Sequence, residues 1–213
     1  MKNFFSPSVL KWIFISVISI LWLSIFWNAY GFRGIEGFNW GIIVHETGEL
    51  GWELLIFTIF ISLFQKTSKI HFPKITIFSR LLPLRKYSGI FAFLIIATHA
   101  LAEFAKQGIG FFDLTEIFDA SFTTHHAAIF GTISFLIMLP LFVTSTDWAV
   151  KKMGTKAWKN LQRFTHVAFV FAALHIILLD YFGRKESIEF GPIILLTIYF
   201  VGYGYLFWRR KNK

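Results

Sequence analysis

The chain contains no cysteine. Disulfide bonds, thiolate metal sites and iron–sulfur clusters are therefore excluded, because each of them needs cysteine sulfur. Any metal or metal-containing cofactor must instead be held by the 7 histidines, the 12 aspartates and glutamates or the 3 methionines. This set of ligands suits a haem or a metal site built from nitrogen and oxygen.

Charged residues are scarce as well. They make up 15% of the chain, against roughly 25% in soluble domains, while hydrophobic residues make up 55%. The mean hydropathy is +0.60. The sequence has no glycine-rich phosphate-binding loop, and it has no long soluble block outside its apolar stretches. We therefore expect no bound flavin or nicotinamide domain in this chain.

Six apolar stretches are long enough to cross about 30 Å of hydrocarbon as helices. They cover approximately residues 8–28, 42–64, 87–105, 123–143, 158–180 and 190–208. The first is followed by Asn28-Ala29-Tyr30-Gly31, a poor match to a signal-peptide cleavage site, so we expect this helix to be retained. The sequence predicts an all-α integral membrane protein: a bundle of six transmembrane helices in a single membrane domain, residues 1–213.

Positive charge indicates the orientation of this bundle. Most of the 21 lysines and arginines lie in alternate connections, namely at residues 2–11, 66–86, 151–163 and 209–213. By the positive-inside rule these connections are cytoplasmic, so both termini are predicted to be cytoplasmic. The net charge of +9 is then explained by topology and by contact with anionic membrane lipid, and we expect no nucleic-acid partner.

Two histidines lie inside apolar stretches at matching depth. His99 is 13 residues beyond Lys86, and His175 is 12 residues beyond Arg163. At about 1.5 Å of helix rise per residue, both imidazoles lie roughly 18–20 Å from the same membrane face. Two imidazoles at one depth can bind one planar metal cofactor from both sides, so the spacing predicts a membrane-embedded haem b. Ligation by two imidazoles leaves no open iron position, which favours electron transfer over oxygen activation.

The order of motifs resembles that of the ferric-reductase-like transmembrane domain superfamily, over about residues 42–182. Within it, the sequence is most similar to the haem-binding membrane subunit of the periplasmic methionine-sulfoxide reductase system. The motifs are Thr47-Gly48, Arg85-Lys86-x-x-Gly89 running to His99, Leu139-Pro140 followed by Thr144-Ser145, and Gly154-x-x-x-Trp158-x-x-Leu161-Gln162-Arg163 running to His175. The resemblance implies a six-helix bundle with haem b and electron flow across the bacterial cytoplasmic (inner) membrane.

One residue departs from the pattern of this family. Close members carry a Leu-His-Arg triplet before the final histidine, whereas this chain has Gln162 at the middle position. An amide oxygen is a poor ligand for haem iron, so we expect one haem rather than two. His166 is four residues further on and on the same helical face, so it is the alternative ligand for a second haem. The competing interpretation of His166 is structural, as an inter-helix hydrogen bond.

Ionisable residues also gather near the predicted outer end of the bundle. His45, Glu46, Glu49 and Glu53 begin the second stretch, Glu103 lies one turn beyond His99, and His125 and His126 precede the fourth stretch. These groups, the outer cluster, could form a proton relay, a quinone headgroup site or a His/Glu metal site. Alternatively, they lie at headgroup level, where they cap the N-termini of their helices and interact with the positive ends of the helix dipoles.

The sequence therefore favours a redox subunit that acts as an oxidoreductase only together with a partner. Electrons would come from a quinol or from a separate flavin reductase and would pass through the haem to a periplasmic acceptor, such as a methionine-sulfoxide reductase. Two alternatives stay open. One is a haem-free proton or divalent-metal transporter that uses the outer cluster, although no inverted repeat is visible in the sequence. The other is an assembly or anchoring subunit whose histidines only pack.

Overall fold

The computed structural model describes residues 6–31, 38–74, 77–108, 126–179 and 190–212, and every regular element in these ranges is a helix. The helices are α1 (Pro7–Gly31), α2 (Trp40–His71), α3 (Ile77–Leu81), α4 (Leu84–Gln107), α6 (His126–Val143), α7 (Asp147–Met153), α8 (Thr155–Leu161), α9 (Phe164–Leu179) and α10 (Phe190–Lys211). The predicted all-α fold class is confirmed.

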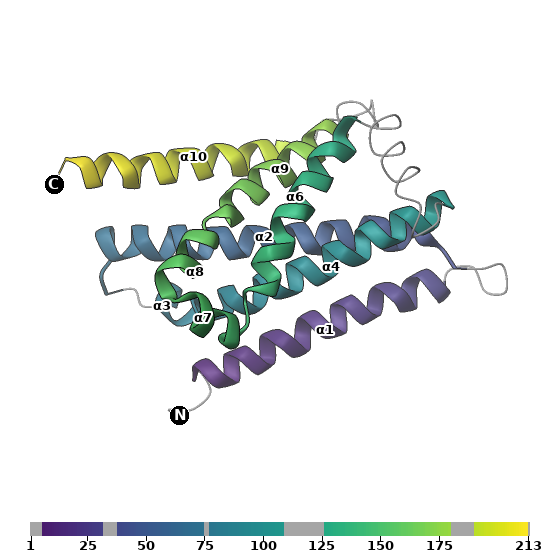
Figure 1. Ribbon diagram of the computed structural model, residues 1–213, viewed down its shortest axis with the longest axis horizontal. Helices are drawn as coiled ribbons and strands as arrows, with labels where there is room; N and C mark the ends of the chain where they lie inside the picture. Colours follow the sequence, from purple (N-terminus) through teal and green to yellow (C-terminus); the bar gives the residue numbers. More distant parts are fainter. Residues whose placement is uncertain (1–5, 32–37, 75–76, 109–125, 180–189, 213) are drawn as a thin grey trace.

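The long helices form a bundle with α2 in its middle (Figure 1). The α4 helix runs along α2, and α6 packs against α9 as a second closely contacting pair. The α1 and α10 helices lie on opposite sides of the bundle. The start of α1 and the end of α10 are at the same end, which we call the termini end. The α2 helix finishes there, and α4 starts there.

Burial separates the central helix from the peripheral ones. Of the most apolar window of each helix, 61% is buried for α2 but only 11% for α1 and 6% for α10. Large apolar side chains such as Trp27 on α1 and Phe207 on α10 are exposed. An apolar surface of this kind suits a helix that faces lipid. The α1 and α10 helices are therefore the lipid-facing sides of a multi-pass integral membrane protein.

The helix of the fourth predicted stretch is shorter than α1, α2, α4 and α10. Five helices are long and apolar enough to cross a membrane, if α8 and α9 are counted as one span over Thr155–Leu179. The α6 helix, which contains Pro140, meets the same criterion only together with α7, and the two are bent by 86° relative to each other. The predicted fourth span is described as α6 (His126–Val143), after which the chain turns sharply into α7 at the termini end.

Local sequence accounts for several helix boundaries. The side chain of Asn39 accepts hydrogen bonds from the backbone N–H groups of Gly41 (3.0 Å) and Ile42 (3.4 Å), which caps the start of α2. Gly108 ends α4 with φ 72°, a left-handed conformation that glycine adopts readily. Thr146 caps α7 through its hydroxyl, which accepts from the N–H of Ala149 (3.3 Å). The abrupt α6–α7 bend therefore ends in a new, separately capped helix.

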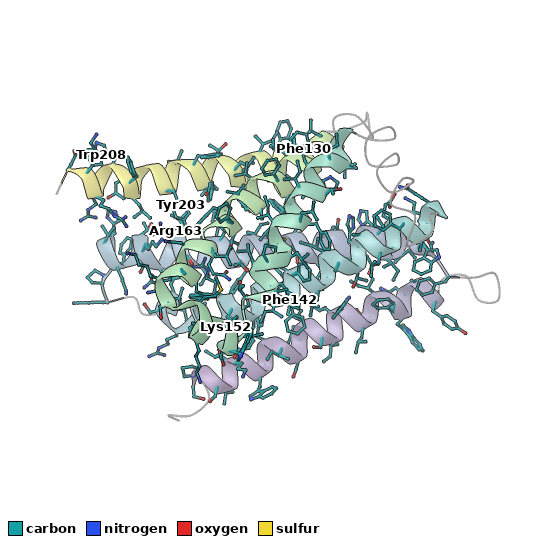
Figure 2. All side chains as sticks on the ribbon, in the orientation of Figure 1. Phe130, Phe142, Lys152, Arg163, Tyr203 and Trp208 are labelled. Carbon is teal, nitrogen blue, oxygen red and sulfur yellow. The ribbon has the colours of Figure 1, made fainter. Side chains whose placement is uncertain are left out.

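Positive charge is concentrated at the termini end. Lys152, Arg163 and the end of α10 near Trp208 lie in this part of the molecule (Figure 2). Among the described lysines and arginines, Lys106 at the other end of α4 is the exception. This one-sided distribution is what the positive-inside rule requires, and the cytoplasmic location of the termini end stays a prediction.

Candidate functional site

The structure brings the two predicted haem ligands together. His99 lies on α4 and His175 on α9, and their ring centres are 6.4 Å apart with an angle of 80° between the ring planes. The two helices belong to different packed pairs, α2–α4 and α6–α9. The histidine pair therefore lies where the two helix pairs meet, in the half of the bundle away from the termini end.

Hydrogen bonds fix the tautomer of each ring. The Nδ1 atom of His99 lies 2.8 Å from the carbonyl oxygen of Val44, and the Nδ1 atom of His175 lies 2.7 Å from that of Ala127. A carbonyl can only accept, so each Nδ1 carries the proton and donates it. In an imidazole whose Nδ1 carries the proton, the lone pair available to a metal is the one on Nε2. Metal-binding histidines use this arrangement, in which a backbone carbonyl or carboxylate orients the ring through its second nitrogen.

The spacing of the rings fits one metal between them. A metal–imidazole bond is about 2 Å long, and the ring centre lies about 1 Å behind the bonding nitrogen. Two imidazoles on opposite sides of one metal thus place their ring centres about 6 Å apart. The observed 6.4 Å agrees with that value. His99 and His175 therefore fit axial ligation of a haem, and this role stays a prediction.

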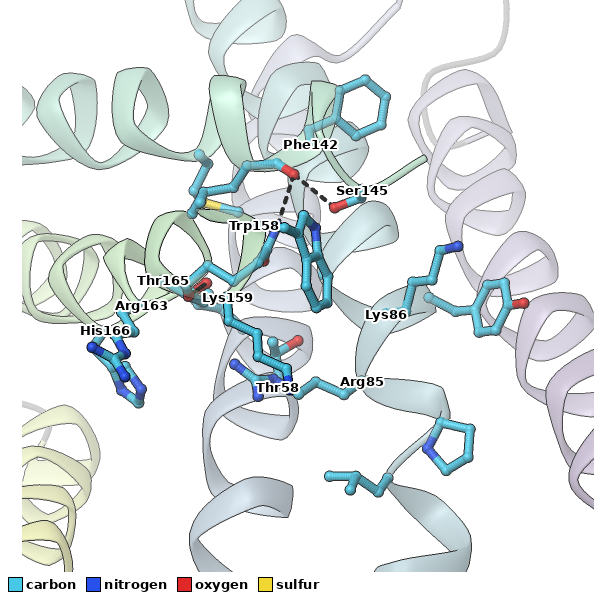
Figure 3. Close-up of a pocket in the computed structure, with 18 of the residues that line it drawn as sticks. Thr58, Arg85, Lys86, Phe142, Ser145, Trp158, Lys159, Arg163, Thr165 and His166 are labelled. Atoms are coloured by element: carbon cyan, nitrogen blue, oxygen red, sulfur yellow. Dashed lines mark hydrogen bonds between the residues drawn. The ribbon is translucent and has the colours of Figure 1, made fainter. Parts of the chain in front are cut away.

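A separate pocket of about 660 Å³ lies near the termini end, between α2, α4, α6 and α8–α9 (Figure 3). Five cationic side chains line it, and none of the described residues that line it is acidic. These five are Lys66, Arg85, Lys86, Lys159 and Arg163, and we call them the pocket cations. Figure 3 shows Arg85 and Lys159 approaching each other beside Thr58, with Lys86 on the far side. The pocket does not include His99 or His175.

Gln162 and His166 both line this pocket. The Gln162 side-chain amide donates to the carbonyl oxygen of Leu141 at 3.3 Å, so it ties the α8–α9 junction to α6. The His166 ring packs against Tyr199 and Tyr203, with ring centres 5.8 and 5.0 Å away. Its Nδ1 atom is buried and has no hydrogen-bond partner among the described residues. The predicted inter-helix hydrogen bond is therefore not formed through this atom.

One ion pair stands beside the pocket. The ammonium group of Lys86 lies 2.6 Å from a carboxylate oxygen of Asp147, which joins the start of α4 to α7. The hydrogen bond from Lys86, together with its charge, holds the pKa of Asp147 below its ordinary value. Lys86 is thus compensated by a carboxylate, whereas the other four pocket cations form no ion pair with a described carboxylate.

The outer cluster is only partly assembled in the described residues. His45 and Glu49 approach to 3.5 Å, one turn apart on α2, with side chains 54% and 65% exposed. Glu53 is exposed too, and Glu46 is half-buried. Glu103 accepts hydrogen bonds from Lys106 (3.5 Å) and Gln107 (2.8 Å).

His125 and the side chain of His126 lie outside the described residues, so their place in the outer cluster stays a prediction. Within the described part of the chain, no three histidine, aspartate or glutamate side chains are placed to hold a metal ion.

The basic pocket was not predicted from the sequence. Its cations come from three separate segments of the chain, and the positive-inside rule already accounted for each of them. The sequence signal that could have indicated the pocket is Gln162, which replaces the histidine of the family's Leu-His-Arg triplet. Where a haem ligand is missing, space is left next to Arg163. The close contacts of Gly48 with His99 and of Gly131 with His175 were not predicted either.

Comparison with known proteins gives a consistent assignment. The family described as "Ferric reductase like transmembrane component" matches residues 47–174, which is more than half of the chain. This range contains His99, and His175 directly follows its last residue. The match therefore covers the helices that carry the histidine pair.

Relatives with known names point the same way. The chain is 29% identical to the protein-methionine-sulfoxide reductase heme-binding subunit MsrQ of Caulobacter vibrioides, over 84% of this chain and 83% of that protein. The identity to the subunit of the same name from Yersinia pseudotuberculosis is 27%, over 84% of this chain and 79% of the relative. It is 30% to the magnetosome protein MamZ of Magnetospirillum gryphiswaldense, over 65% of this chain but 20% of that protein. With its helical bundle and more than half of its length matched, the chain belongs to the ferric reductase like transmembrane component family.

Proposed function

We propose that the chain is the haem b-binding electron-transfer subunit of a protein-methionine-sulfoxide reductase in the bacterial inner membrane. The observation that carries this proposal is the pair His99 and His175, whose Nδ1 atoms bond to backbone carbonyls while their ring centres are 6.4 Å apart. Support comes from the names of the relatives that match over most of the chain, which are heme-binding subunits of that reductase. Electrons would move from the termini end toward a periplasmic partner.

The chain's own residues bind and orient the cofactor. A bound haem supplies one-electron chemistry at its iron. His99 and His175 would occupy both axial positions, so they would leave no site at which oxygen could bind. The carbonyl groups of Val44 and Ala127 hold the two rings in the ligating tautomer. An optical spectrum of the purified protein tests this proposal: reduced-minus-oxidised Soret and α bands are expected, and a colourless protein would support an anchoring subunit without haem.

We propose that the chain binds one haem. Gln162 already donates to the Leu141 carbonyl, and the α4 residues that line the basic pocket include no histidine that could pair with His166. A pyridine haemochrome assay, divided by protein concentration from amino-acid analysis, should therefore give about one haem per chain. A ratio near two would mean that His166 and a further residue supply a second site.

We propose that the basic pocket receives the electron donor. Four cations without a carboxylate partner among the described residues repel one another around this pocket, so an anion bound among them relieves that repulsion. A neutral quinol headgroup offers no such compensation. The pocket therefore favours the phosphate-bearing flavin of a separate flavin reductase over a quinol as the donor.

We propose that the outer cluster contacts the periplasmic partner. His45, Glu49 and Glu53 are exposed along one side of α2. Replacing Glu49 and Glu53 by lysine should slow electron delivery to the partner and reverse its dependence on salt, because the charge of the contact surface changes sign.

The haem content and midpoint potential should stay unchanged in that double variant. Stopped-flow oxidation of the reduced protein by the partner, at low and high salt, measures the rate. A variant with unchanged delivery and a shifted, pH-dependent potential would instead assign these acids to proton coupling.

A further inference from the structure

The two histidines of the proposed haem site are held by the same local construction on two different helix pairs. His99 on α4 donates to the carbonyl of Val44 on α2, and His175 on α9 donates to the carbonyl of Ala127 on α6. In both cases a glycine follows the accepting residue by four positions: Gly48 after Val44 and Gly131 after Ala127. The arrangement of carbonyl, glycine and imidazole therefore occurs twice in the fold.

Helix geometry explains why that position is occupied by glycine. The carbonyl of residue i already accepts the N–H of residue i+4 and points along the helix toward it. A second donor must reach the same oxygen from the side, across residue i+4. Not every side chain at i+4 blocks such an approach, since Ser88 donates to the Leu54 carbonyl although residue 58 is threonine, but at Gly48 and Gly131 the imidazole occupies the space that a side chain would need. A helix favours alanine over glycine, so glycine at this position has a reason other than helix formation.

Distances in the structure show how little space these glycines leave. A Cβ atom on Gly131 would lie 2.9 Å from Nδ1, 3.0 Å from Cε1 and 3.1 Å from Cγ of His175. A Cβ atom on Gly48 would lie 3.1 Å from Nδ1 and 3.3 Å from Cε1 of His99. Both rings thus pack closely against a bare Cα position, and the contact is tighter at Gly131.

We propose that Gly48 and Gly131 are positioning residues for His99 and His175. Their missing side chains open the Val44 and Ala127 carbonyls to the imidazole N–H groups, which sets the tautomer and the rotation of each ring. The proposal rests on the proposed function only in naming haem iron as the metal between the two Nε2 atoms. Because a backbone carbonyl cannot be deleted by mutation, these glycines are the positions at which the orienting contacts can be altered.

The test uses the full-length chain purified in detergent, with Gly131→Ala and Gly48→Ala. Loss of an orienting partner typically weakens metal retention by about 10–100-fold, so haem transfer to an excess of apomyoglobin should be about tenfold faster or more in Gly131→Ala. The low-spin electron paramagnetic resonance signal should also shift its g values, because these report the rotation of the axial rings. Gly48→Ala should change both readouts in the same direction and by less.

Two glycines of α10 serve as matched controls. A Cβ atom on Gly202 would lie 2.8 Å from the Leu63 side chain, a contact as short as that at Gly131 but without a histidine, and Gly204 has nothing within 4 Å. Gly202→Ala and Gly204→Ala should retain the wild-type haem transfer rate and g values. If Gly202→Ala matched Gly131→Ala, the effect would be one of general packing and the proposal would be overturned.

The remaining outcomes also decide the question. Wild-type g values and transfer rates in both Gly131→Ala and Gly48→Ala would overturn the positioning role while the haem function stood. A wild-type protein that purifies without haem would overturn the proposed function instead. Nitrogen-15 spectra of the labelled histidines in the haem-free protein would then test the glycines alone: the Nδ1–H tautomer is expected in the wild type and should be lost in Gly131→Ala. If Gly131→Ala fails to fold, the milder Gly48→Ala decides by the same measurements.

Discussion

His175→Ala and His99→Ala should each yield a folded protein that no longer retains haem. Each substitution removes one of the two nitrogens that we propose as haem ligands. Alanine offers no lone pair, and the nearest polar partner of the lost ring is a helix carbonyl that is already bonded within its own helix. We expect the Soret absorbance per protein to fall to near background, with circular dichroism unchanged.

Matched controls separate ligation from general effects. His71→Ala removes an imidazole that bonds to the Tyr205 hydroxyl at 2.9 Å near the termini end, outside the proposed site. Gln162→Ala removes the side-chain hydrogen bond to Leu141 in the basic pocket. Both variants should keep the full haem content. A His175→Ala protein with wild-type absorbance would show that the site has been assigned to the wrong residues.

Neutralising the basic pocket should slow electron entry strongly without loss of haem. In Arg85→Gln/Arg163→Gln, two of the four unpaired pocket cations are removed. A cleft lined by charge of one sign raises the association rate of an oppositely charged partner by about 10–1000-fold, so we expect reduction by an anionic donor to slow by about tenfold or more. Stopped-flow absorbance of the haem band measures this rate.

The donor can be varied together with the pocket. Reduced riboflavin 5′-phosphate carries a phosphate that reduced riboflavin lacks, and a short-chain quinol is neutral. The wild type should be reduced fastest by the phosphorylated flavin, and the double variant should lose that preference. Lys156→Gln/Lys211→Gln removes two exposed cations at the same end outside the pocket and should behave like the wild type. Equal rates with all three donors in the wild type would argue against an anion-binding entry site.

The sequence by itself determined the fold class and the candidate ligands. Apolar length and low charge predict helices across a bilayer, because only closed backbone hydrogen bonding is tolerated in hydrocarbon. The equal depth of His99 and His175 also follows from the sequence alone, since helix rise converts position into distance. The prediction of membrane helices and the prediction of equal depth both hold whichever helices are neighbours in the bundle.

Other features were decided only by the tertiary structure. The 86° bend between α6 and α7 is one of them, because the apolar pattern of residues 123–143 does not indicate the direction in which the chain continues after Val143. The basic pocket is assembled from α2, α4 and the α8–α9 junction, which no local pattern brings together.

The double arrangement of carbonyl, glycine and imidazole was likewise invisible in the sequence. Gly48 and Gly131 lie in segments with no detectable repeat, and each contacts a histidine on another helix. Periodicity reports which face of a helix is apolar, but it does not report which residue of a neighbouring helix approaches that face. The contact is set by the packing of α2 with α4 and of α6 with α9, and that packing brings each imidazole to its carbonyl.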